Sequence, residues 1–360
     1  MKIGILTFHC AHNYGAILQC YALQECLAMF GFEVEVIDYR PEFLVNPYKV
    51  FQRYRFSLRH PYRLPYEIYR EVKYALPRWV RFEKSIKNLL KLSKQYKEVP
   101  GSYDVYIIGS DQIWNTRISR GDINYFSAFQ FKKQSKKYIA YAASMEALSL
   151  SSQDKELCER YLPNFDAIGV RESNLLGLLK PFYNGWMDEV LDPVFLLSKE
   201  QWANVARHPR VDEPYVLLYQ VREDKRAEMY AEQIAIERKC KLIELCSFVK
   251  RNDSVGIAFQ TSSVEEFVGL FMNANFIVTS SFHGTVFSII FEKKFYALKL
   301  GDGADSRIEQ LLRTFNLDYH LVDLDNTAYE EQNTNYAVIK EMIRNRAELS
   351  RGFLIDAINK

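Results

Sequence analysis

The residues with the clearest chemical capacity follow a short apolar run near position 280. Ser280, Ser281 and His283 follow the β-branched residues 277–279, and an apolar helical pattern begins at 286–290. A strand that passes through small polar residues into a helix leaves backbone N–H groups pointing outward, where they bind anions. His283 adds a side chain that exchanges a proton near neutral pH. The pattern predicts an anion site with a proton carrier, or alternatively a helix N-cap made by Ser280 or Ser281 with His283 packed beside it.

The same succession of strand and polar turn occurs at two earlier places. Residues 2–8 form an apolar run that leads into the polar turn 9–16, and residues 104–108 lead into the turn 109–115. The carboxyl ends of parallel strands meet at one edge of a sheet, where open α/β sheets bind their ligands. The candidate site residues on these two turns are Asn13, Gly15, Ser110 and Asp111.

Alternating strand and helix patterns continue along both halves of the chain. Further strands are expected at 34–39, 137–144, 167–170, 215–221, 241–245 and 294–298. Helices are expected near 154–161, 225–238, 263–271, 308–314 and 335–358, the third of them opened by a Ser-x-x-Glu capping box. This alternation predicts an α/β protein with two parallel sheets.

The predicted domain organisation places a boundary near Asp192-Pro193. Residues 1–193 form an N-terminal Rossmann-like domain with an aromatic and basic helical insertion at about 41–100, and residues 194–335 form a C-terminal one. The remaining residues, 336–360, form a helix that could pack back on the first domain.

Composition excludes several classes of protein. The chain of 360 residues is 48% hydrophobic and 26% charged, with a net charge of +2, so it is globular and its total charge does not suggest nucleic-acid binding. No apolar run reaches the ~18–20 residues of a membrane span, and Met1-Lys2 leads straight into a strand without a signal-peptide pattern. The six scattered cysteines have no CxxC or zinc spacing. We therefore expect a cytoplasmic protein with reduced thiols and no metal.

The expected cofactor content follows from the first turn. The turn after residues 2–8 contains only Asn-Tyr-Gly, and the Gly-x-Gly-x-x-Gly fingerprint of dinucleotide enzymes is absent. No cofactor is expected.

The segment 49–97 has an unusual charge. It carries fourteen Lys or Arg residues against three Glu, and residues 78–91 place apolar side chains at helical spacing opposite a cationic face. One interpretation is a solvated helix face. The other is a surface that meets anionic lipid head groups, which would place the protein peripherally at the inner face of the membrane.

Three of these motifs together resemble the polysaccharide pyruvyl transferase family. They are Asn13-Tyr14-Gly15-Ala16, the run from Ile108 to Asn115 that contains Gly-Ser-Asp-Gln-x-Trp-Asn, and Ser280-Ser281-Phe282-His283-Gly284-Thr285. Weaker matches follow in the expected order at 169–173, 191–193 and 306–308. The resemblance covers nearly the whole chain, and the Gly-Ser-Asp-Gln-x-Trp-Asn run is its most specific part.

The resemblance implies a fold and an activity. The family has two facing Rossmann-like domains, similar to one class of glycosyltransferases. It transfers the enolpyruvyl unit of phosphoenolpyruvate to a sugar of a cell-surface polysaccharide, or of its lipid-linked precursor, and forms a pyruvate ketal. The implied partners are phosphoenolpyruvate and a saccharide acceptor.

The resemblance also assigns roles to residues. His283 is the expected proton carrier and Asp111 the expected base for the sugar hydroxyl, although Asp111 could instead cap a helix. Arg171 and Arg307 are the expected cations for the donor, because a guanidinium fork binds two oxygens at once; the alternative for Arg171 is a surface pair with Glu172. The remaining donor-binding residues are Asn13, Gly15, Ser110, Ser281, Gly284 and Thr285.

One position departs from the family pattern. Many members carry Arg two positions before the histidine, where this chain has Ser281. Two alternatives to pyruvyl transfer therefore stay open: a nucleotide-sugar-dependent glycosyltransferase with the same two domains, and a non-catalytic sugar- or phosphate-binding protein. The acceptor sugar, the position and stereochemistry of the ketal and the oligomeric state do not follow from the sequence.

Overall fold

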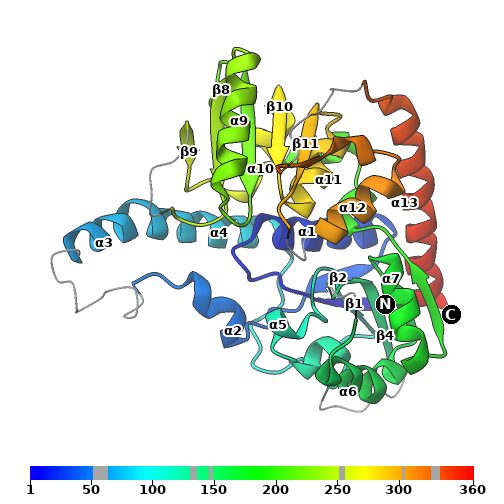
Figure 1. Cartoon of the computed structure of the whole chain (residues 1–360). Helices are drawn as coiled ribbons and strands as arrows, with labels where there is room; N and C mark the ends of the chain where they lie inside the picture. The colour runs from blue at the N-terminus through cyan, green and yellow to red at the C-terminus, as the bar shows by residue number, and fades with distance from the viewer. Residues whose placement is uncertain (52–63, 130–135, 146–148, 251–255, 302–304, 326–332) are drawn as a thin grey trace.

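Two parallel six-stranded sheets organise the chain, as the alternating pattern predicts. The computed structural model describes residues 1–51, 64–129, 136–145, 149–250, 256–301, 305–325 and 333–360. The first sheet has the order β2-β1-β3-β4-β5-β6 and the second the order β12-β11-β10-β7-β8-β9. The two sheets lie in separate halves of the molecule with helices between and around them (Figure 1). The expected Rossmann-like α/β architecture is confirmed.

The first sheet is built from residues 2–189. Its strands are β1 (Lys2–Leu6), β2 (Glu33–Val36), β3 (Val105–Ile108), β4 (Lys137–Ala143), β5 (Ala167–Val170) and β6 (Trp186–Glu189). The central strands are apolar and buried along their whole length, since helices cover both faces of the sheet. The helices among these strands are α1 (Tyr14–Met29), α2 (Glu42–Val45), α3 (Leu64–Arg70), α4 (Leu76–Leu89), α5 (Thr116–Ser119), α6 (Ser152–Tyr161) and α7 (Ser173–Leu179).

The second sheet is built from residues 215–323. Its strands are β7 (Tyr215–Gln220), β8 (Lys241–Cys246), β9 (Ile257–Phe259), β10 (Phe276–Thr279), β11 (Phe295–Lys299) and β12 (Leu321–Asp323). Its helices are α9 (Lys225–Glu237), α10 (Val264–Asn273), α11 (Phe282–Ile290) and α12 (Asp305–Thr314), and α8 (Lys199–Val205) precedes it. The capping box predicted at the start of α10 is present: Ser263 and Glu266 each bond the other's backbone N–H.

Helix α1 lies between the two sheets (Figure 1). Nearly all of its side chains are buried, which is the behaviour of a helix that is apolar on every side. Its residues share one hydrophobic core with Trp202, Phe267 and Phe287 from the second half. The core is therefore continuous across the junction of the two halves.

The long helix formed by α3, a π-helical stretch (Glu71–Ala75) and α4 also bridges the halves. The Arg78 guanidinium donates to the Tyr14 hydroxyl and the carbonyls of Cys246 and Gln260 at 3.0, 3.0 and 3.1 Å. Arg78 is buried, so the expectation of an exposed cationic face is wrong at this position, because the guanidinium is used to bind backbone carbonyls of the second half. Residues 52–63 of the basic segment lie outside the described residues.

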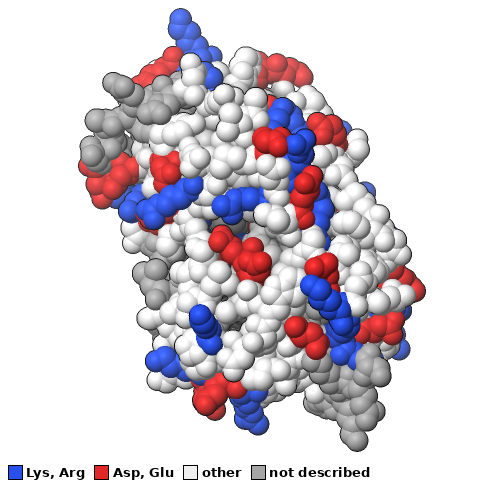
Figure 2. Space-filling view, turned by 90° about the vertical axis from the view of Figure 1, so that its right-hand side faces the viewer, with Lys and Arg blue, Asp and Glu red and all other residues white. Residues whose placement is uncertain are grey.

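The C-terminal helix α13 (Tyr336–Asn359) packs on the first sheet, as expected (Figure 1). Phe353 contacts Trp186 with ring centroids 4.6 Å apart, and Lys137 Nζ donates to the Ile358 carbonyl at 2.7 Å. Basic and acidic side chains are interspersed on the face that carries α13, so it has no broad field of one sign (Figure 2). None of the helices in the described ranges has the length and apolar character that a membrane span requires.

Arg78 gives a test of the bridge between the halves. Changing Arg78 to Met should lower the free energy of unfolding by about 3–5 kcal/mol, because several buried acceptors lose their donor. Arg81→Met is the matched control: this side chain is half exposed and pairs with Glu266 at 2.8 Å, so its loss should cost about 1 kcal/mol or less. Urea unfolding measures both, and equal losses would show that Arg78 is not a bridge.

Candidate active site

His283 lies at the start of α11, where strand β10 gives way to the helix. Ser281 is the N-cap residue, and its hydroxyl accepts from the Gly284 N–H at 3.3 Å. The Thr279 hydroxyl donates to the Tyr219 carbonyl at 2.7 Å and accepts from the Ser281 N–H at 3.1 Å. The N-cap foreseen for this turn is thus present, and it fixes the orientation of the residue two positions later.

Gly284 and Thr285 hold the first turn of α11 against its neighbours. A Cβ on Gly284 would lie 2.2 Å from Thr279 Oγ1, so only glycine fits there. Thr285 Oγ1 donates to the Ser281 carbonyl at 3.1 Å. Both residues therefore position the turn.

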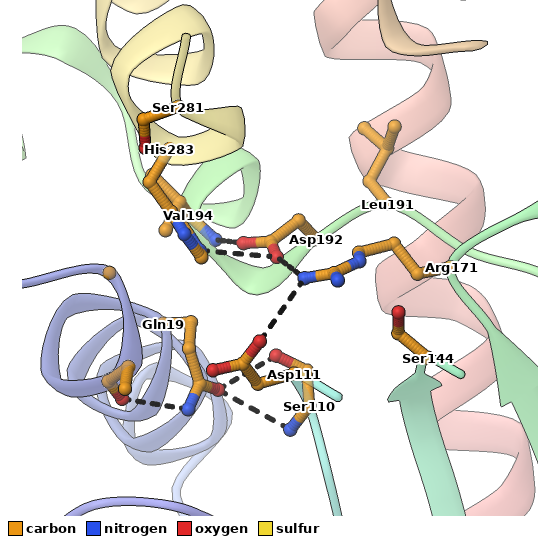
Figure 3. Close-up of polar contacts among 12 residues, drawn as sticks. Gln19, Ser110, Asp111, Ser144, Arg171, Leu191, Asp192, Val194, Ser281 and His283 are labelled. Carbon is orange, nitrogen blue, oxygen red and sulfur yellow. Dashed lines mark hydrogen bonds and ion pairs between the residues drawn. The ribbon is translucent and has the colours of Figure 1, made fainter. Parts of the chain in front are cut away.

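The imidazole of His283 faces two elements of the first half. A Cβ on Gly15 would lie 2.1 Å from His283 Nδ1, so the ring packs directly over the first turn of α1. On its other side, Nε2 lies 3.6 Å from Asp192 Oδ2 (Figure 3). Nε2 is buried and has no hydrogen-bond partner among the residues that the structure describes.

Asp192 is the centre of a buried ionic cluster. Its Oδ2 accepts from Arg171 Nη1 at 2.9 Å, and its Oδ1 accepts from the Val194 N–H at 3.0 Å (Figure 3). Burial by itself raises the pKa of Asp192, but His283 and Arg171 outweigh it and lower that pKa to about 2. The carboxylate is therefore ionised at neutral pH.

Arg171 is surrounded by acidic side chains. Besides Asp192, its Nε bonds Glu172 Oε1 at 3.2 Å, and Nη1 lies 3.9 Å from Asp111 Oδ1. Burial lowers the pKa of Arg171, but the three carboxylates reverse this and hold that pKa above its ordinary value. Arg171, the cation expected to bind the donor at the end of β5, is thus already paired with carboxylates of the protein. Its pair with Glu172 is buried instead of lying at the surface.

Phe282 lies beside both arginines that the sequence singled out. The guanidinium carbons of Arg171 and Arg307 are 4.5 and 6.0 Å from the centre of its ring. Both distances are in the range of cation–π attraction. The ring thus brings a residue of the first half and a residue of the second half to one place.

The ends of β1 and β3 are joined through α1. Asn13 caps α1, with its side-chain oxygen accepting from the N–H groups of Gly15 and Ala16. The Ser110 hydroxyl donates to Gln19 Oε1 at 2.7 Å (Figure 3). Gln19 in turn donates to the Thr7 hydroxyl at 3.0 Å. Asp111 caps no helix, since Asn115 takes that role for α5.

A pocket of about 280 Å³ lies between the two halves beside this cluster. Its lining includes four of the predicted site residues, Asn13, Asp111, Ser281 and Arg307. The other six are Gly15, Ser110, Arg171, His283, Gly284 and Thr285. They hold the turns and the ionic cluster behind this lining. Within the described residues, no three His, Cys, Asp or Glu side chains are grouped as metal ligands.

Sequence reasoning missed several residues of the site. Asp192 belongs to the predicted domain boundary and to the weak family match at 191–193 and is not among the predicted site residues, although it contacts both Arg171 and His283. Tyr48, Gln112 and Arg222 also line the pocket. Arg222 follows strand β7 by two residues, so the rule that selected the other strand ends could have found it.

Gly15 gives a test of the packing around His283. Replacing glycine by alanine in a helix ordinarily stabilises it by about 1 kcal/mol. Gly15→Ala should instead destabilise the protein by about 1–3 kcal/mol, because the new methyl group collides with the imidazole. Gly177→Ala in α7, where a Cβ meets open space, is the control and should stabilise by roughly 0.5–1 kcal/mol. Two changes of the same sign in urea unfolding would contradict the packing.

The buried Asp192 carboxylate is expected to make the free energy of unfolding depend on pH. Its pKa falls from 3.8 in the unfolded chain to about 2 in the folded protein. It therefore contributes stability of about 2 kcal/mol above pH 4, which is lost as the pH falls toward 2. Asp192→Asn should be less stable than the wild type at pH 7, and this difference should shrink below pH 4. A difference in unfolding free energy that stays constant from pH 7 to pH 2.5 would contradict the buried carboxylate.

The comparisons with known proteins place the chain in a family. It is similar to Arabidopsis thaliana UGT89C1, with 10% identity, a TM-score of 0.52 and coverage of 99% of each chain, a likeness that shows the fold alone. UDP-GlcNAc 2-epimerase from Methanocaldococcus jannaschii follows, with 10% identity, a TM-score of 0.47 and coverage of 96% of this chain and 93% of that one. No curated protein matches. The profile of the polysaccharide pyruvyl transferase family matches residues 13–301, and the chain therefore belongs to that family.

Proposed function

We propose that the protein transfers the enolpyruvyl unit of phosphoenolpyruvate to a saccharide and forms a pyruvate ketal. The observation that carries this proposal is the buried His283 Nε2, which has no hydrogen-bond partner among the described residues and lies beside the ionised Asp192. A proton carrier next to a fixed negative charge, behind the lining of a pocket between two sheets, suits a reaction that protonates an enol ether.

The donor carries a phosphate and a carboxylate, so its pocket needs cations. Arg222, Arg307 and Asn13 all line the 280 Å³ pocket. Ser281 replaces the arginine found in many family members, and its hydroxyl is used to cap α11. We assign the missing positive charge to Arg222, which follows β7 by two residues, and to Arg307, which lies in the first turn of α12. Direct contact of Arg171 with the donor stays a prediction, since that side chain is held by Asp192 and Glu172.

The proton chemistry is assigned to His283 and Asp111. Imidazolium at His283 gives a proton to the methylene carbon of the donor, and the C2 atom becomes cation-like. Asp192 stabilises the positive charge of the His283 imidazolium before the proton is transferred to the donor. Asp111 lines the pocket and accepts the proton of the sugar hydroxyl as its oxygen bonds to C2.

The remaining steps complete the ketal. The C2–O bond to phosphate breaks and inorganic phosphate leaves. A second hydroxyl of the same sugar then bonds to C2 and releases its proton. One proton of the two hydroxyls ends on the new methyl group and the other on phosphate, so the reaction is balanced without a cofactor.

A lipid-linked acceptor is supported by the surface of α3 and α4. Tyr66, Tyr69, Val72 and Val80 are about half exposed along this long helix, which projects from the body of the molecule (Figure 1). Helix α4 also carries Lys84 and Lys87. An aromatic and basic helix of this kind suits the surface of an anionic membrane, and we retain peripheral membrane contact as part of the proposal.

His283→Asn tests the proposed role. Turnover, measured as phosphate released from phosphoenolpyruvate in the presence of acceptor, should fall by roughly 10²–10⁴, the worth of one positioned proton-transfer group. The melting temperature and its rise with phosphoenolpyruvate should stay close to the wild type. A variant that is destabilised but fully active per folded molecule would overturn the assignment. Release of a nucleoside diphosphate from a nucleotide sugar by the wild type, without phosphate release from phosphoenolpyruvate, would favour the glycosyltransferase.

A further inference from the structure

A second pocket, of about 240 Å³, adjoins the first on the side of α3 and α4. The two pockets share Tyr48, which lines both. They are also joined along the chain, since His12 lines the second pocket and Asn13 lines the first. A molecule bound in the second pocket can therefore reach toward the first.

Aromatic rings form much of the second pocket. His12, Tyr48, Trp79 and Phe248 line it. His12 stacks between Tyr48 and Phe82, with ring centroids 5.2 and 5.1 Å away, and Tyr48 is parallel to Phe248. Burial lowers the pKa of His12, which outweighs the opposite effect of Glu83, so the ring is neutral at pH 7. Neutral aromatic faces attract the C–H groups of a pyranose ring.

Two carboxylates supply the polar side of this pocket. Glu67 Oε2 is buried and has no hydrogen-bond partner among the described residues. Glu71 accepts from the Phe51 N–H at 3.1 Å. A buried acceptor without a donor is costly, and a ligand hydroxyl would satisfy it. The same two negative charges disfavour phosphate and carboxylate groups, so this pocket does not suit a second copy of the donor.

The two arginines that line this pocket are hydrogen-bonded to backbone carbonyls of the protein itself. Arg70 Nη2 donates to the Val249 carbonyl at 3.2 Å, and Arg78 holds the carbonyls of Cys246 and Gln260. These contacts hold the Phe248 segment of the second half against the helix of the first half. The wall is therefore built by both halves.

We propose that this second pocket is the acceptor subsite and holds a neutral pyranose, with Trp79 and Phe248 against its faces and Glu67 accepting from its hydroxyls. The inference rests on the proposed function, which supplies the reason for a saccharide beside the donor. Because Tyr48 lines both pockets and Asp111 lines the first, a sugar in the second pocket lies beside the pocket that holds the proposed base.

Saccharide binding without the donor tests the subsite. The full-length protein is applied to an array of neutral and acidic oligosaccharides, and the affinity of the best neutral ligand is then measured by calorimetry. Trp79→Ala and Phe248→Ala should each weaken this binding by roughly ten- to a hundred-fold, because a large apolar contact is lost. Glu67→Gln should weaken it less. Phe30→Ala is the control, since Phe30 is 45% exposed against 51% for Phe248 and lies away from the pocket.

Donor binding separates this inference from the proposed function. The rise in melting temperature with phosphoenolpyruvate should be unchanged in Trp79→Ala and Phe248→Ala. Wild-type saccharide affinity in both variants, or exclusive binding of phosphorylated ligands, would overturn the subsite. Loss of saccharide binding in these variants, in a protein that neither binds nor turns over phosphoenolpyruvate, would support the subsite and reject pyruvyl transfer.

Discussion

The buried carboxylate of Asp192 is the interaction on which the junction of the two halves depends. It lies on the segment that leaves the first sheet, and it meets Arg171 of the first half and His283 of the second. A lone carboxylate in this position would be costly to bury, so the two partners and the Val194 N–H are required to keep it ionised. The same arrangement aligns the imidazole. Asp192 therefore both stabilises the junction of the two halves and orients the imidazole of His283.

The core of both sheets could be predicted because its strands are continuous apolar runs. β3, β5 and β10 are buried along their whole length, and each is followed by a polar turn. The strands that were missed, β6, β9 and β12, all lie at the edges of the two sheets. Edge strands are short and partly exposed, so Trp186-Met187-Asp188-Glu189 carries no apolar run to reveal it.

Only part of the candidate site could be predicted from the sequence. The expectation that polar turns after the strands form the site identified the turns that surround the pocket, because parallel strands place their carboxyl ends at one edge of a sheet. It could not tell which side chains face the pocket and which hold the turns: Ser110 and Gln19 bond one another, and Arg171 is enclosed by carboxylates. Tyr48 and Arg78 come from the aromatic insertion, whose pairing with the second half depends on contacts between residues more than 160 positions apart. No local pattern carries that information.

The place of α13 has a consequence for the order in which the protein acquires its structure during synthesis. Phe353 covers the face of the first sheet at Gly169 and Trp186, and Ser350 accepts from the Leu191 N–H, beside the central carboxylate. All strands of the first sheet leave the ribosome before α13 does. That sheet therefore keeps an apolar face open to solvent while the whole second half is being translated, a state that invites chaperone binding or aggregation. The N-terminal half is complete only after α13, which follows the second sheet in the chain, has been synthesised.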